Sequence, residues 1–176
     1  MLSALLLIFL GAFSSCNLFD KVEDASFDIT LPLTFSISDA TVPLLGQPTE
    51  KAYTGSELLN AASNAEVASF ANKIKAFKVN KITYTISGAN PNTVTFTNSL
   101  MKISSTGTTI AAPNSVSLTN TVETVLTSNE TGFNELAEKL LDDKQELIQL
   151  NGTLSKTPVA FSVTFKFYVT VTISAL

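Results

Sequence analysis

The chain has 176 residues, enough for one well-packed domain, and a formal net charge of −4 with only 15% charged residues. It contains 23 Thr, 19 Ser and 13 Asn, whereas His, Arg and Trp are absent and every basic residue is Lys. The lack of His excludes Ser–His and Cys–His nucleophile pairs and His metal ligands, and the lack of Arg excludes a bidentate phosphate clamp. The acidic balance argues against nucleic-acid binding, which needs a basic patch.

An uncharged, almost wholly apolar run occupies residues 2–13. A transmembrane helix needs about 20 apolar residues, so this run is too short to span a bilayer and is typical of the apolar region of a signal peptide. Small residues follow it, and then the single cysteine of the chain, which has no partner for an internal disulfide. We therefore predict a signal peptide over residues 1–15, cleaved between Ser15 and Cys16.

The segment Phe13-Ser14-Ser15-Cys16 resembles the lipobox of bacterial lipoprotein precursors. The resemblance implies that Cys16 receives a diacylglycerol, becomes the mature N-terminus and attaches the protein to the outer membrane. Residues 16–25 then form a short tether that contains Asp20, Glu23 and Asp24. This acidic segment is a solvated linker or an export signal for the cell surface, so the side of the membrane stays open. The alternative is an ordinary secretory signal with an incidental cysteine.

Period-two patterns at both ends of the remaining chain predict two long strands. Apolar residues fill every odd position from Phe27 to Ile37 and again from Val159 to Ile173. Pro32 predicts that one edge of the first strand lacks a full hydrogen-bonding partner. At about 3.3 Å per residue the last strand approaches 50 Å, so we expect it to bend or to change partners midway.

Four shorter strands are expected between these two, over residues 75–87, 94–103, 116–126 and 150–154. The apolar phase flips near Asn80-Lys81, which predicts a bulge in the first of them, and a second irregularity is expected in the next. Two segments have helical spacing instead: residues 63–74, which open with a capping-box pattern from Ser63 to Glu66, and residues 133–141. Ser56, Leu58 and Leu59 are interpreted as an earlier turn of the first helix.

These elements predict a mainly β protein, built as an antiparallel β-sandwich (immunoglobulin-like or related) of about six or more strands with two packed α-helices. We expect one domain over residues 26–176, with no internal repeat.

Candidate chemistry in this domain is sparse. Asp142 and Asp143 are neighbours on a predicted helix and do not converge on one substrate atom. The sequence contains no calcium loop and no nucleotide-binding motif, so we expect no metal, cofactor or catalytic residue. The 12 Phe fall mostly at apolar positions and are expected in the core. Tyr53 and Tyr84 are less certain, and Tyr168 lies on the polar side of the last strand, where its ring faces solvent or a partner.

The sequence therefore favours a monomeric, lipid-anchored protein of the cell envelope that acts as a non-enzymatic binding or structural module. The sequence does not identify the ligand, and both a protein and a glycan stay open. The first alternative is a filament or adhesin subunit that assembles by strand exchange, suggested by the long C-terminal strand. The second is a hydrolase that works without His.

Overall fold

Two four-stranded antiparallel sheets form the fold of this computed structural model, which describes residues 24–174 except 46–48, 92, 120 and 128. The strands are β1 (Ala25–Asp39), β2 (Lys51–Asn60), β3 (Ile74–Asn90), β4 (Thr95–Ile103), β5 (Thr109–Ser117), β6 (Thr124–Val125), β7 (Gln145–Leu154) and β8 (Val159–Ile173). A short 3₁₀ turn (Ala61–Ser63) precedes the helix α1 (Ala65–Ser69), and the second helix is α2 (Glu130–Asp143).

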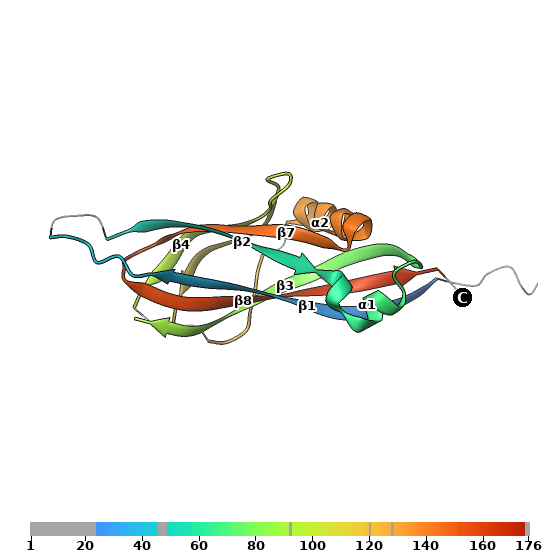
Figure 1. The fold of residues 1–176 in the computed structure, drawn as a ribbon, viewed down its shortest axis with the longest axis horizontal. Helices are drawn as coiled ribbons and strands as arrows, with labels where there is room; N and C mark the ends of the chain where they lie inside the picture. Colours follow the sequence, from blue (N-terminus) through green and yellow to red (C-terminus); the bar gives the residue numbers. More distant parts are fainter. Residues whose placement is uncertain (1–23, 46–48, 92, 120, 128, 175–176) are drawn as a thin grey trace, which may run out of the picture.

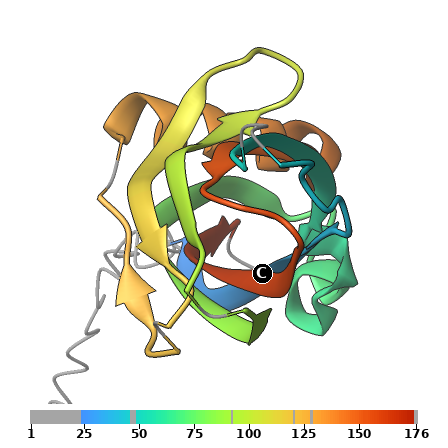
Figure 2. The ribbon, with the colours of Figure 1, turned by 90° about the vertical axis from the view of Figure 1, so that its left-hand side faces the viewer.

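The strand order is β1-β8-β3-β6 in one sheet and β2-β7-β4-β5 in the other (Figures 1 and 2). Along the chain, successive strands alternate between the sheets except at the β4–β5 hairpin, and the first and last strands are neighbours. Eight strands wound in this way form a jelly roll. The predicted fold class, a mainly β antiparallel sandwich with two helices, is confirmed, and its topology is the jelly-roll order rather than the immunoglobulin order.

The core lies between the sheets and is built from the apolar positions that alternate along the strands. Every odd residue of β8 is buried, as are the odd residues of β1 from Ile29 to Ile37. β1 is an edge strand, as Pro32 predicted, and it pairs with β8 over its full length. The last strand was expected to bend or to change partners midway, and it does not change partners, because β8 keeps β1 on one side and β3 on the other.

The pairing of β3 with β8 is irregular, unlike the pairing of β1 with β8. Its register against β8 shifts between Val79 and Lys81, where the sequence predicted a bulge, and again near each end. β4 also carries the irregularity expected of it, around Asn98, whose φ is 49°. β8 therefore pairs with β1 without a break in register, whereas the irregularities of the β3–β8 pairing are accommodated by register shifts.

Three sequence expectations are wrong in detail. Ser56, Leu58 and Leu59 belong to strand β2, because pairing with β7 fixes an extended backbone there. The predicted strand over residues 116–126 is divided between β5 and β6, which lie in different sheets. The predicted helix over residues 63–74 shrinks to α1, and its cap is Asn64, whose side chain accepts the backbone N–H groups of the second and third helical residues.

The helix predicted over residues 133–141 forms within α2, where Asn129 caps the first turn and Lys144 ends the helix in the left-handed conformation. Its buried stripe contains Phe133, Leu136 and Leu140. α2 contacts β3 of one sheet and β4, β5 and β7 of the other, so it covers one side of the sandwich between the sheets.

The long molecule has two distinct poles. β1 begins and β8 ends at the same pole, beside α1 (Figure 1). The loop between β1 and β2 lies at the opposite pole, where it exposes Val42, Leu44 and Leu45. The predicted site of lipidation and the apolar loop are thus connected to opposite ends of the domain.

Candidate functional site

The outer side of the β1-β8-β3-β6 sheet carries the polar residues of three long strands, and we call it the outer face. Even-numbered residues of β1 and β8 point to this side because their odd neighbours fill the core. α2 contacts β3 of this sheet, but it lies at the side of the sandwich, between the two sheets. The outer face therefore combines side chains that lie more than 100 residues apart in the sequence.

One part of the outer face carries two rows of hydroxyl groups. The strand register aligns Thr34 of β1, Thr164 of β8 and Thr85 of β3 in one row, and it aligns three serines in the next row. The hydroxyls of Thr34 and Thr164 lie 2.9 Å apart in a hydrogen bond. This part of the face offers donors and acceptors but no charge. The three serines are Ser36, Ser162 and Ser87.

Nearer the pole where β1 begins, the outer face has an open cleft of about 310 Å³. Asp28 and Thr30 of β1 form one rim, Asn80 and Lys81 of β3 form the other, and Tyr168 of β8 lies between them. Lys81 places its ammonium 4.2 Å from the centroid of the Tyr168 ring. The ring is half-buried, so the sequence correctly predicted that Tyr168 lies on the polar side of the strand.

Hydrogen bonds link both rims of the cleft to the central strand. The hydroxyl of Thr170 donates to Oδ1 of Asp28 at 2.6 Å, and Nδ2 of Asn80 donates to the same hydroxyl at 2.8 Å. Asp28 and Asn80 are therefore held at a fixed separation across β8. These two hydrogen bonds fix the side chains of Asp28 and Asn80 before any ligand binds.

Glu123, in the segment just before β6, accepts three side-chain hydrogen bonds, one of them from the hydroxyl of Tyr168. Its carboxylate accepts hydrogen bonds from Nζ of Lys166 at 2.9 Å, the hydroxyl of Thr83 at 2.6 Å and the phenol of Tyr168 at 2.7 Å. These bonds, the one from Lys166 above all, lower the pKa of Glu123 to about 2. The same carboxylate raises the pKa of Tyr168, so the phenol stays protonated and continues to donate.

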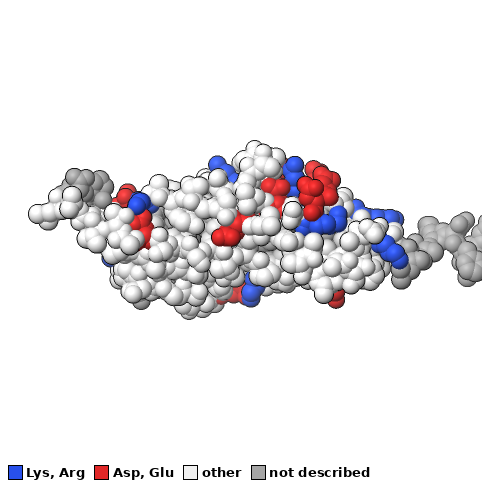
Figure 3. All heavy atoms as spheres, viewed as in Figure 1, with Lys and Arg blue, Asp and Glu red and all other residues white. Residues whose placement is uncertain are grey.

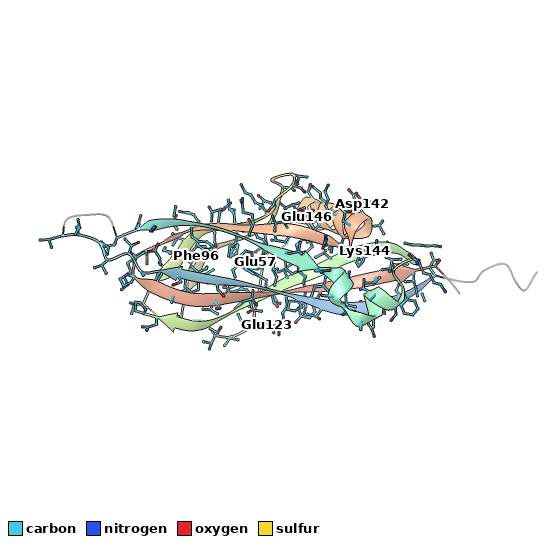
Figure 4. The ribbon with its side chains drawn as sticks, viewed as in Figure 1. Glu57, Phe96, Glu123, Asp142, Lys144 and Glu146 are labelled. Atoms are coloured by element: carbon cyan, nitrogen blue, oxygen red, sulfur yellow. The ribbon has the colours of Figure 1, made fainter. Side chains whose placement is uncertain are left out.

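Few charged side chains lie on the visible surface (Figure 3). Acidic and basic side chains gather over α2 and near the β1–β2 pole, and most of the remaining atoms are uncharged. Glu123 lies on the outer side of its sheet, away from α2 and from Glu57 and Glu146 (Figure 4). The carboxylates therefore do not converge on one point.

The structure places only some of the acidic and cysteine residues that the sequence analysis named. Cys16 and Ser15, with the whole lipobox-like segment, lie outside the described residues, as do Asp20 and Glu23. Asp24 is described, and its carboxylate pairs with Lys75 at 2.6 Å. Asp142 and Asp143 are the last two residues of α2.

The other two tyrosines are not on the outer face. Tyr84 is 8% exposed and belongs to the core, and Tyr53 packs edge-on against Phe96. Burial raises the pKa of the Tyr53 phenol. Within the described part of the chain, no group of three or more acidic or cysteine side chains is placed to hold a metal ion. Over the same residues, no helix is long and apolar enough to cross a membrane.

Sequence reasoning found Tyr168 but missed its partners. Asp28 and Asn80 are polar residues of predicted strands, yet only the β1-β8-β3 order brings them to the same cleft. Glu123 falls in a segment that was predicted to be a continuous strand, and its role depends on a loop. Alternation showed which side each residue faces, whereas strand order determined which residues meet.

The comparisons with known proteins add little. No family model matches the sequence, and no curated protein matches it. Among solved structures, a chain titled Desmodium yellow mottle tymovirus matches with a TM-score of 0.38 and 11% identity, over 89% of this chain and 93% of that chain. A similarity at this level is no basis for assigning a function.

Proposed function

We propose that the protein is a non-enzymatic binding module of the cell envelope, anchored by lipid on Cys16, that binds its ligand on the outer face. The observation that carries the proposal is the cleft at Tyr168, which exposes an aromatic ring among ordered polar groups. Such an arrangement suits recognition, because rigid aromatic and polar groups bind without costly rearrangement. The lipobox-like segment supports the anchor.

The arrangement of β8 favours this function over assembly by strand exchange. A strand that is donated to another chain must be unpaired in its own chain, whereas β8 is hydrogen-bonded to β1 and β3 along both of its edges. Removing it from the sheet would expose its apolar face, which includes Phe165 and Phe167. We therefore propose a monomer whose C-terminal strand is structural.

The anchor is tested by the mass and location of the native protein. We expect the protein extracted from membranes to begin at Cys16 and to carry the mass of the attached lipid. The Cys16→Ala variant should leave the membrane fraction. A mature N-terminus elsewhere, or a Cys16→Ala protein that still sediments with membranes, contradicts the lipid anchor.

The binding function is tested separately with the lipid-free chain from Asn17 to Leu176, which contains every element of the fold. We expect this chain to sediment with envelopes isolated from the cells that produce it, and we expect Tyr168→Ala to abolish the sedimentation. Leu147→Ala is the matched control, because Leu147 is a large, 43% exposed side chain on the opposite sheet. Equal sedimentation of both variants rules out the outer face as the binding surface.

A further inference from the structure

We propose that the cleft at Tyr168 binds a neutral saccharide, an inference that rests on the proposed binding function and specifies its ligand. Charge favours a neutral ligand. The cleft is lined by one acidic and one basic side chain, Asp28 and Lys81, so its formal charge is zero. The ammonium of Lys81 already faces the ring of Tyr168. An anionic ligand would meet the carboxylate of Asp28, and a cationic ligand would meet Lys81.

The hydrogen-bonding capacity of the cleft favours a ligand with many hydroxyls. A sugar hydroxyl donates one bond and accepts others, so it requires both kinds of group within a short distance. Asp28 contributes a carboxylate, Asn80 an amide with both a donor and an acceptor, and Thr30 a hydroxyl. The bonds through Thr170 fix the first two side chains. The rims therefore present donors and acceptors side by side, as a ligand rich in hydroxyls demands.

The aromatic ring of Tyr168 favours a saccharide over other polar ligands. One face of a pyranose ring consists largely of C–H groups, which can pack against the part of the half-buried Tyr168 ring that Lys81 leaves uncovered. Tyr168 loses little freedom on binding, because Glu123 already holds its phenol. A purely polar ligand would not use the apolar surface of this ring, and a purely apolar ligand would bury the polar atoms of Asp28 and Asn80 that are not bonded to Thr170.

The dimensions of the cleft agree with a short saccharide. Its volume of about 310 Å³ lies at the lower end of the range for small-ligand sites. The cleft is open to solvent and lies on the same face as the hydroxyl rows at Thr164 and Ser162. A longer chain can therefore extend from the cleft across the outer face, so a terminal or internal segment of a polysaccharide fits.

The test extends the envelope sedimentation assay with two treatments of the envelopes. Protease digestion removes exposed protein, whereas periodate cleaves the vicinal diols of saccharides. We expect sedimentation of the Asn17–Leu176 chain to survive protease and to be lost after periodate. The opposite result, loss after protease and survival after periodate, overturns the saccharide proposal and leaves the binding function intact. A chain that does not sediment with untreated envelopes contradicts the proposed function itself.

Purified probes give an independent measurement that does not need the envelope. Maltohexaose, cellohexaose, laminarihexaose and mannan serve as neutral probes, and oligogalacturonate serves as the acidic one, with binding followed by NMR titration. We expect a neutral probe to shift the amide signals around Tyr168, and Tyr168→Ala to weaken this binding by about tenfold or more. Leu147→Ala should bind like the unmodified chain.

Three results of these titrations overturn the proposal. The first is binding to the acidic probe alone. The second is binding that Tyr168→Ala leaves unchanged although the variant melts cooperatively. The third is the absence of binding to every neutral probe together with periodate-resistant sedimentation. Asp28→Asn is the second variant: it keeps the shape of the side chain, so its weaker binding reports the loss of the carboxylate rather than unfolding.

Discussion

Individual side chains on β8 show how differently its two faces contribute to stability. Phe165 is 2% exposed and packs edge-on against Phe35, with ring centroids 5.9 Å apart. Thr164, its neighbour, faces outward and hydrogen-bonds to Thr34. The inner residue combines apolar burial with aromatic packing, whereas the outer one makes a bond in contact with water.

We predict that Phe165→Ala lowers the free energy of unfolding by about 3 to 5 kcal/mol, because it removes buried area and leaves a cavity. Thr164→Ala should cost about 1 kcal/mol or less, since its hydroxyl bond exchanges with water. Urea denaturation of the two variants measures both values. Similar losses would mean that β8 is buried on both faces.

The low pKa of Glu123 links stability to acidic pH. Its folded value is about 2 and its ordinary value is 4.5, so the folded state binds this proton less readily than the unfolded state does. The stabilisation is therefore complete above about pH 4.5 and is lost as the pH falls toward 2. Lys51 likewise holds the pKa of Asp39 at about 2, so that group titrates over the same range.

We predict that Glu123→Gln reduces the dependence of melting temperature on pH between pH 4.5 and 2, because the side chain that titrates there is gone. The difference between the variant and the unmodified protein is the quantity to compare, since Asp39 contributes equally to both. Asp39→Asn provides the matching comparison at the end of β1. Parallel curves for Glu123→Gln and the unmodified protein would show that the carboxylate does not stabilise the fold.

Among the elements, α2 fits the sandwich through a position that lacks a side chain. Gly132 lies in its first turn, where a Cβ atom would be 2.3 Å from the carbonyl oxygen of Thr109 and 2.7 Å from the Cα atom of Ile110. Those atoms belong to the backbone of β5 and cannot rotate away. Helix α2 therefore approaches β5 more closely than any other residue would allow.

Gly132→Ala is a test in which two effects oppose each other. Alanine favours a helix by about 1 kcal/mol over glycine, but the clash forces α2 away from β5. We predict a net destabilisation of about 1 to 3 kcal/mol, as for overpacked cores, measured by urea denaturation. Asn134→Ala, at an exposed position of the same helix, should be neutral or slightly stabilising. A Gly132→Ala variant as stable as the unmodified protein would contradict the close contact between α2 and β5.

The elements also show what the sequence can predict. β1, β8 and α2 were predictable because their patterns continue over many residues, and the bulge in β3 was visible as a change of phase. β2 was not, since Leu58 and Leu59 are adjacent and the strand is defined by pairing with β7. The cleft was predictable only at Tyr168, because its other residues come from strands whose order depends on the whole fold.

At the scale of the molecule, the sheet edges bear on self-association. β1 is an edge strand interrupted by Pro32, which lacks the N–H that a neighbouring chain would need. A lysine on an edge strand also discourages such pairing, but Lys166 lies on β8, which is not an edge strand. The other edge strands are the short β6 in the same sheet and β2 and β5 in the second sheet, so the expectation of a monomer depends on all four edges.

We predict that the chain from Asn17 to Leu176 is a monomer by light scattering over a wide concentration range. Deleting residues 167–176 should abolish cooperative melting, because it removes buried residues such as Phe167 and Val171 from the middle of a sheet. A reserve donor strand would be dispensable for folding. Ordered polymers of the full chain, or a stable domain after the deletion, would favour the filament alternative.

The position of β8 also determines when the molecule can fold. The last strand to be synthesised lies between β1 and β3, so an unfinished chain has no strand to join them. The contacts that complete the sheet join residues far apart in sequence, and such contacts form slowly. The β1-β8-β3-β6 sheet is therefore completed only after residues 159–173 have been synthesised.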